Sequence, residues 1–169
     1  MISKKVAEMM LLQANREFYS ERLYIAMEFY FKSLDLNSYA KLFNDYAMEE
    51  RNHAYKMLDF LDEHNCSTKI SKLDNVTTTY SSPKDVFEKA YAHEIQVTKW
   101  ITEIYHQAIK DNDVASQQFL NWFLEEQREE EDKMLTRLNR LKLAGNDMSA
   151  ILFLDMHDGA TAGLSTNQL

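Results

Sequence analysis

The near absence of helix-breaking residues constrains this chain more than any other feature. Its 169 residues include only three glycines, at positions 145, 159 and 163, and one proline, at position 83. Both residue types interrupt helices, so long stretches without them that are rich in Leu, Met, Glu, Lys and Ala are typical of extended helices. We therefore predict an all-α fold with helices at about 5–34, 38–65, 83–111, 113–144 and a short fifth helix at about 147–159, followed by a flexible tail at 160–169.

Residues typical of helix ends lie between these stretches. Asn37 or Ser38 can cap the second helix by accepting a hydrogen bond from a free backbone N–H. Ser82 and Pro83 form a stronger start signal for the third helix, because serine caps well and proline fits the first helical position. The Asp-Asn-Asp sequence at 111–113 predicts a tight corner, with an acid ready to begin the fourth helix.

One connection is much longer than the others. Residues 66–82 span 17 residues, which reach about 55 Å when fully extended at roughly 3.3 Å per residue. A helix of about 27 residues is roughly 40 Å long, so this segment can run the whole length of the bundle. The other joints are short and force antiparallel neighbours. The sequence thus predicts two helical hairpins joined by one long crossover, an antiparallel four-helix bundle in a single domain over residues 1–169.

Composition and charge exclude several classes of protein. The chain has 27 acidic and 19 basic residues, a formal net charge of −8, which argues against nucleic-acid binding and suits a protein that concentrates cations. No apolar run approaches the roughly 18 residues of a membrane helix, and the first residues lack the features of a secretory signal. We therefore expect no membrane partner and a cytoplasmic location. Cys66 is the only cysteine, so no intrachain disulfide is possible, and an inert loop thiol is favoured over a reactive one.

Each of the four long helices carries an apolar stripe that is interrupted near its middle by polar groups. The interruptions are Glu17 in the first helix, Glu50 and His53 in the second, Glu94 in the third, and Gln127 and Glu130 in the fourth. Glu17 lies 17 residues before the first hairpin turn, and Glu50 lies 12 residues after it. Glu94 lies 17 residues before the second turn, and Glu130 lies 17 residues after it. In antiparallel pairs these residues meet at about the same height, so we expect one buried polar layer.

Four carboxylates cannot remain ionised and uncompensated inside a bundle, because each unpaired buried charge is costly. They must be protonated, paired with cations or bound to metal, and the stripes supply no Lys or Arg at that level. Oxygen-rich ligation with one nitrogen suits Fe or Mn, and the spacing of Glu50 and His53 places both on one helical face. A lone Glu-x-x-His is common without a metal. Tyr24 has two interpretations, a satisfied core tyrosine or a donor of an electron or hydrogen bond to a metal centre.

The pattern of these residues resembles that of the ferritin-like di-iron bundles, which place single glutamates on two helices and Glu-x-x-His on the other two. The matching residues are Glu17, Glu94 and Glu50-Arg51-Asn52-His53. The fourth helix departs from that pattern, with Gln127-Arg128-Glu129-Glu130 in place of a second Glu-x-x-His. That departure resembles bacterial non-haem ferritin. The similarity covers essentially the whole chain, including the fifth helix.

The resemblance implies a role for each matching residue. Glu17, Glu50 and His53 correspond to the ligands of a first iron, and Glu94, Glu50 and Glu130 to those of a second, with Glu50 bridging. Gln127 corresponds to an amide near the oxygen-binding face, and Tyr24 to a tyrosine beside the centre. Glu49, Glu126 and Glu129, with Glu130 shared, correspond to a third iron site. The alternative for this last set is a solvated acidic face, because nearly every residue from 125 to 132 is charged.

The resemblance also implies a function. Bacterial non-haem ferritins act as ferroxidases that oxidise Fe(II) to Fe(III) with O2 or H2O2, and they store ferric oxyhydroxide inside a hollow shell of 24 subunits. The apolar segment 151–156 is similar to the ferritin helix that packs at a symmetry axis of the shell.

Other di-iron families fit less well. A haem-binding bacterioferritin needs a methionine at position 52 and a second histidine near position 130, so no haem is expected. A rubrerythrin-type peroxidase needs a cysteine-rich iron domain, and a miniferritin binds iron between subunits. A helical scaffold that binds a divalent ion passively stays open. The iron route, the preferred oxidant and the role of His157 are also open.

Overall fold

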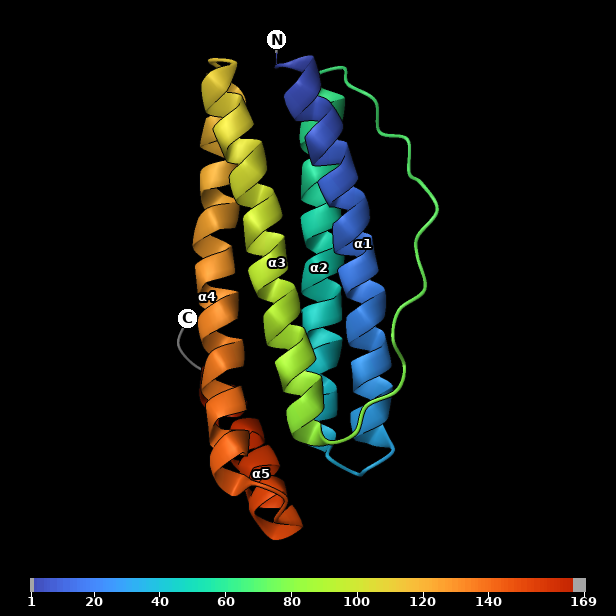
Figure 1. The fold of residues 1–169 in the computed structure, drawn as a ribbon, viewed down its shortest axis with the longest axis vertical. Coiled ribbons are helices and arrows are strands. Elements are labelled where there is room, and N and C mark those ends of the chain that lie inside the picture. The colour runs from blue at the N-terminus through green and yellow to red at the C-terminus, as the bar shows by residue number, and fades with distance from the viewer. Residues whose placement is uncertain (1, 166–169) are drawn as a thin grey trace.

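The computed structural model describes residues 2–165 and consists of five helices (Figure 1). They are α1 (Lys4–Lys32), α2 (Asn37–Glu63), α3 (Pro83–Lys110), α4 (Val114–Ala144) and α5 (Met148–Ser165). The predicted all-α fold is confirmed, and the described residues contain no strand. The largest difference is at α5, which continues to Ser165 where the sequence predicts a flexible tail from 160. The rest of that predicted tail, 166–169, lies outside the described residues.

The predicted connectivity is also confirmed. Helices α1 and α2 form one antiparallel hairpin and α3 and α4 form the other, while the crossover runs along the outside of α1 from the end of α2 to the start of α3 (Figure 1). Asn15 of α1 holds this crossover, because its Oδ1 accepts a hydrogen bond of 2.8 Å from the backbone N–H of Ser71. None of the helices in residues 2–165 has the length and apolar character needed to cross a membrane.

Most helix ends follow the expected chemistry. Ser82 accepts a hydrogen bond from the backbone N–H of Asp85, with Pro83 at the first helical position. Asp113 begins α4 by accepting from the backbone N–H of Ser116. Such caps satisfy N–H groups that have no partner inside the helix.

The predicted cap of α2 is wrong. Neither Asn37 nor Ser38 caps this helix, since its N-cap is Leu36, which makes no side-chain cap bond. The backbone N–H of Tyr39 instead donates to Asp155 Oδ1 of α5 at 2.7 Å. A carboxylate at a helix N-terminus is favourable both as an acceptor and through the helix dipole. The cap is therefore supplied by tertiary structure.

The core consists of two apolar halves. The half toward α5 is rich in rings, including those of Tyr24, Phe31, Tyr39, Phe43 and Phe87. The half at the other end of the bundle is largely aliphatic, with Val6, Met10, Met57, Leu61 and Ile101 among its members. Burial of these side chains provides the main driving force for folding. The polar layer lies between the two halves, so apolar packing on both sides holds its height in the bundle.

Candidate metal centre

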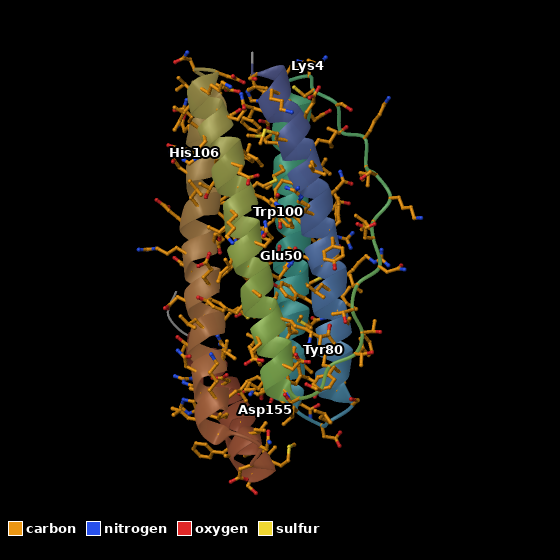
Figure 2. The ribbon with its side chains drawn as sticks, viewed as in Figure 1. Lys4, Glu50, Tyr80, Trp100, His106 and Asp155 are labelled. Atoms are coloured by element: carbon orange, nitrogen blue, oxygen red, sulfur yellow. The ribbon has the colours of Figure 1, made fainter. Side chains whose placement is uncertain are left out.

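The structure brings the predicted polar interruptions together in one buried layer. Glu50 lies about midway along the bundle (Figure 2). Its companions in the layer all lie in the interior, with side chains almost inaccessible to solvent: Glu17, His53, Glu94, Gln127 and Glu130. Each helix of the bundle contributes at least one of them. The matched heights follow from hairpins with short turns, which align the middle of each helix with that of its partner.

Within this layer the potential ligand atoms form two groups of three. In the first group, ligand atoms of Glu17, Glu50 and His53 all lie within 4.8 Å of one another. In the second group, those of Glu50, Glu94 and Glu130 meet the same limit. Glu50 belongs to both groups. On α2 the His53 Nδ1 lies 3.6 Å from Glu50 Oε2, as expected for residues one helical turn apart.

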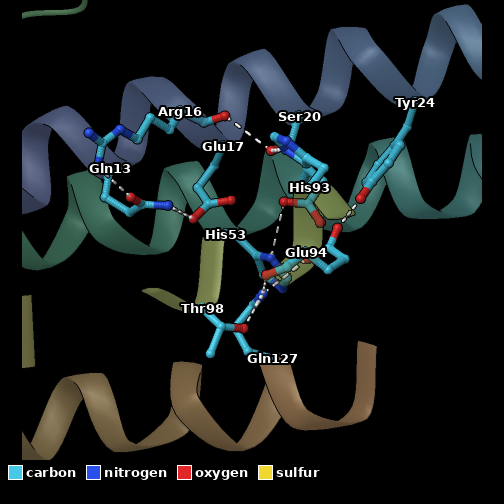
Figure 3. A network of polar contacts seen from close by, with 11 residues as sticks. Gln13, Arg16, Glu17, Ser20, Tyr24, His53, His93, Glu94, Thr98 and Gln127 are labelled. Carbon is cyan, nitrogen blue, oxygen red and sulfur yellow. Dashed lines mark hydrogen bonds and ion pairs between the residues drawn. The ribbon is translucent and has the colours of Figure 1, made fainter. Parts of the chain in front are cut away.

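Hydrogen bonds orient the carboxylates of Glu17, in the first group, and Glu94, in the second group. Gln13 Nε2 donates to Glu17 Oε1 at 2.8 Å, and Gln127 Nε2 donates to Glu94 Oε2 at 3.0 Å (Figure 3). The Tyr24 hydroxyl donates to the other oxygen of Glu94. Tyr24 and Gln127 therefore contact the same carboxylate. Sequence reasoning assigned Gln13 no role, although its position one turn before Glu17 on the same stripe was a usable signal.

Several buried oxygens of the layer have no hydrogen-bond partner. These are Glu17 Oε2 and both carboxylate oxygens of Glu130. Unsatisfied buried polar atoms are rare and costly in folded proteins. Their clustering between four glutamates points to a cation as the missing partner.

The electrostatics of the layer lead to the same conclusion. Burial raises the pKa of Glu50 to about 7 and that of Glu94 to about 8. Burial, together with the nearby charge of Glu50, also raises the pKa of Glu17 and of Glu130. Without a metal these carboxyls hold protons near neutral pH. A divalent cation would replace the protons and stabilise the ionised carboxylates.

His93 is a second polar residue that sequence reasoning missed. Its Nε2 lies 2.7 Å from Ser20 Oγ, and its ring packs edge-on against Tyr24 with centroids 6.1 Å apart. Burial lowers the pKa of His93 to about 4, so the imidazole is neutral and adds no charge beside the carboxylates. It belongs to neither three-residue group. It packs beside Tyr24 and Ser20 on the α1 side of the layer (Figure 3).

The three acids predicted for a third iron site lie in different environments. Glu126 is half-buried, and one of its ligand atoms lies within 4.8 Å of those of His53 and Glu130. Glu49 is exposed and lines a pocket together with His53 and Glu126. Glu129 is exposed, and its Oε2 lies 3.9 Å from Lys133 Nζ. Among the described residues, the close group at this point includes His53 rather than Glu49 or Glu129.

Comparison with known proteins identifies the family. The profile of the Ferritin-like domain matches residues 9–144. The chain belongs to the ferritin family. A bacterial non-heme ferritin of Bacteroides fragilis is 33% identical over 159 residues, which are 94% of this chain and 99% of that protein. A probable bacterial non-heme ferritin-like protein of Haemophilus influenzae is 32% identical over 155 residues, 92% of this chain and 94% of that protein.

Solved ferritin structures agree with the fold of this ferritin. The open pore ferritin of Archaeoglobus fulgidus superimposes with a TM-score of 0.91 at 37% sequence identity, covering 94% of this chain and 98% of that one. The resemblance to bacterial non-haem ferritin inferred from Glu17, Glu94 and Glu50-x-x-His53 is thus confirmed at the level of the family. The assignment of individual ligands stays a prediction.

Proposed function

We propose that this ferritin stores iron and oxidises Fe(II) to Fe(III) at a di-iron ferroxidase centre within each subunit. The observation that carries the proposal is the pair of three-residue groups that share Glu50 in a buried layer with unpartnered carboxylate oxygens. Iron is here the substrate. Glu17, Glu50 and His53 would bind one Fe(II), and Glu50, Glu94 and Glu130 the other, with Glu50 as the bridge.

Charge balance supports two divalent ions. The layer contains four glutamates, and two Fe(II) ions carry a matching positive charge once the carboxyl protons have left. Each Fe(II) gives up one electron, so the pair reduces O2 with two protons to H2O2, or H2O2 with two protons to two waters. Two Fe(III) ions exceed the charge of the carboxylates and need further anionic ligands, which hydroxide from water supplies. That need leads toward ferric oxyhydroxide.

The residues around the layer have separate tasks in this proposal. Gln13 and Gln127 orient Glu17 and Glu94 through their amides. The Tyr24 hydroxyl donates a hydrogen bond to Glu94 and so helps to orient this carboxylate beside the centre. Orienting groups of this kind tune metal ligands and their affinity. Apolar packing above and below the layer keeps solvent from competing for the ions.

A third iron position belongs to the proposal. Glu49, Glu126, Glu129 and Glu130 are its predicted ligands. The short distances among Glu126, His53 and Glu130 favour a position on the α2 and α4 side of the layer. Support is weaker for Glu129, which pairs with Lys133.

We also propose that the subunit assembles into a 24-subunit shell around its ferric mineral, as a single domain over residues 1–169, in the cytoplasm and without haem. Support for the assembly comes from ferritin relatives that match more than nine-tenths of the chain. Size-exclusion chromatography tests the shell, because a species of one or two 19.9 kDa subunits would contradict it. Cell fractionation tests the location, and the absorbance spectrum of the purified protein tests for haem.

Aerobic addition of Fe(II), followed by absorbance of the ferric product, tests the proposed oxidation of Fe(II) at the buried layer. We expect fast oxidation by the wild-type chain that is largely lost in a Glu50→Ala, His53→Ala variant. The competing idea is a scaffold that binds divalent ions without redox chemistry. It requires metal binding with no acceleration of Fe(II) oxidation over buffer.

A further inference from the structure

A pocket connects the surface between α2 and α4 with the metal centre. It encloses about 460 Å³, and its walls include Glu49, His53, Lys56, Asp59, Trp122 and Glu126. His53 is one of these lining residues and also a buried member of the first group. The pocket therefore ends on a side chain that we assign to the centre. It gives a solvent-borne ion access to the buried layer from the side of α2 and α4.

Potential ligand atoms continue from this pocket into the interior. Glu126 faces the pocket, and its ligand atom lies within 4.8 Å of those of His53 and Glu130. Glu130 is 2% exposed, and neither of its carboxylate oxygens has a hydrogen-bond partner. It also belongs to the second group. An ion moving inward would thus pass from Glu126 to both groups while always remaining near oxygen or nitrogen ligands, as hard and borderline cations require.

Ion pairs do not occupy the acids of this pocket. Within residues 2–165, none of the ion pairs includes Glu49, Asp59 or Glu126, although the charge of Lys133 acts on Glu49 from outside the pocket lining. The pocket nevertheless contains one ammonium group, that of Lys56. Its Nζ lies 4.0 Å from the ring centroid of Trp122, a cation–π contact. The Trp122 ring in turn packs edge-on against His53, with centroids 5.5 Å apart.

We propose that this pocket is the route by which hydrated Fe(II) reaches the centre, and that Lys56 controls how tightly the pocket binds a divalent ion. The tethered ammonium adds a positive charge among the acids and lowers their affinity for a second cation. An ion therefore stays briefly at the opening and moves on to His53, Glu126 and Glu130. Trp122 keeps the ammonium on its aromatic face and away from the carboxylates. This inference rests on the proposed ferroxidase function and adds the access route and its controlling residue.

The rate of Fe(II) oxidation at varied Fe(II) concentration tests the proposal in the assembled protein. Lys56→Met keeps an apolar stem over Trp122 and removes the charge. We expect it to lower the Fe(II) concentration at half-maximal rate by about threefold to tenfold, with a smaller change in the maximal rate. Lys56→Arg should keep the wild-type value, because it retains the positive charge and a guanidinium also stacks over an aromatic ring. Lys41→Met is the matched control, since Lys41 is an exposed lysine of the same helix that pairs with Asp45.

Salt separates an electrostatic role from a packing role. The difference between Lys56→Met and the wild type should shrink as NaCl is raised, because salt screens charges near the surface. A purely structural effect of the substitution would not depend on salt. If Lys56→Met and Lys41→Met have the same half-saturating Fe(II) at low salt, the assignment of Lys56 is overturned.

Terbium luminescence provides a readout that is independent of oxidation. Tb³⁺ prefers oxygen ligands and emits when a nearby indole is excited, and Trp122 lines this pocket. We expect tighter Tb³⁺ binding in Lys56→Met than in Lys41→Met, and loss of the sensitised emission in Trp122→Phe. Emission that persists unchanged without Trp122 would place the ion elsewhere and overturn the route.

Failure of the route and failure of the proposed function give different results. Oxidation by all variants with equal half-saturating Fe(II), together with Tb³⁺ affinities that do not differ, overturns the route and leaves the ferroxidase centre intact. Absence of Fe(II) oxidation in the wild type overturns the proposed function and the route with it.

Discussion

The two groups of the metal centre differ in composition and in how they are supported. Of the two groups, only the first contains an imidazole, that of His53, and its Glu17 accepts a hydrogen bond from Gln13 of the same helix. The second group is made of carboxylates alone, and its Glu94 is held by Tyr24 and Gln127 from other helices. Glu130 of the second group has no partner for either oxygen. The first group thus has one buried carboxylate oxygen without a partner, Glu17 Oε2, and the second group has two, so the second depends more on an ion for its compensation.

This difference implies an order of binding. The nitrogen ligand of the first group and the pocket that ends on His53 favour occupation of the first group before the second. In the proposed centre, the second group would become competent once Glu50, ionised by a first metal, could supply the bridge. Oxidation of two Fe(II) ions together requires both groups. Substitutions that affect one group or both should therefore give distinct results.

The largest effect is expected when both groups lose a ligand. Glu50→Ala with His53→Ala should reduce the initial rate of Fe(II) oxidation by about 100-fold or more, because neither group retains three ligands. Stopped-flow absorbance of the ferric product measures the rate. Glu63→Ala, which replaces an exposed acid at the end of α2, is the control for helix substitution. Retention of fast oxidation in the double variant would remove the assignment of this centre.

Removal of the Glu130 side chain alone should impair the second group and leave the first group able to bind an ion. We expect Glu130→Ala to bind one Fe(II) or Zn²⁺ tightly per subunit instead of two, and to oxidise Fe(II) about 10- to 100-fold more slowly. Anaerobic calorimetry gives the number of ions bound. Glu125→Ala replaces an exposed acid of the same helix and should behave as the wild type. Two tight ions in Glu130→Ala would show that Glu130 is no ligand.

Substitution of the amides of Gln13 and Gln127 should affect the two groups separately. Gln13→Ala should weaken the first binding step and Gln127→Ala the second, each by about tenfold, because each amide orients one carboxylate. Stepwise Zn²⁺ titration resolves the two steps. The same step weakened by both substitutions would contradict the division into two groups.

Much of this candidate centre could be predicted from the sequence. Helical periodicity determines which side chains face the interior, and the short hairpin turns determine how far along the bundle axis each of them lies. Glu17, Glu50, Glu94 and Glu130 meet in one layer for that reason. The crossover was predictable from its length, since its residues can span a helix with room to spare.

Features that depend on docking of separate elements could not be predicted in this way. Asp155 caps α2 only because α5 folds back against it, and no local pattern near Asn37 contains that information. His93 lies off the apolar stripe of its helix, so its contact with Ser20 and Tyr24 emerges only when α1 and α3 are packed. Gln13 is a different case, because it lies one turn before Glu17 on the same helix and its spacing was a usable signal for the contact.

A smaller, pH-dependent effect should appear in the metal-free protein. Burial raises the pKa of Glu50 to about 7 and of Glu94 to about 8 from a usual value of 4.5. The native state therefore keeps protons that the unfolded state loses, and the free energy of unfolding falls as pH rises from about 5 to about 8. Denaturant titrations of chelator-treated protein measure this slope. Glu50→Gln with Glu94→Gln should flatten it, and Zn²⁺ should remove it in the wild type. A slope of opposite sign would contradict neutral carboxyls in the layer.

The smallest effect is expected at the edge of the centre. Glu129→Gln should change the oxidation rate by about twofold or less, because Glu129 is exposed and pairs with Lys133. Glu126→Gln should have the larger effect, since Glu126 lies close to His53 and Glu130. Multiple-turnover oxidation assays compare the two. Equal and large losses in both variants would favour the full predicted third site of Glu49, Glu126, Glu129 and Glu130.

The most direct test of the central claim is an anomalous difference map, recorded at the iron edge from crystals soaked anaerobically with Fe(II). We expect two strong peaks inside each subunit, one bounded by Glu17, Glu50 and His53 and the other by Glu50, Glu94 and Glu130. Glu50 should approach both. No peak in the bundle interior, or a single peak that does not contact Glu50, would contradict a di-iron centre built on two groups that share one glutamate.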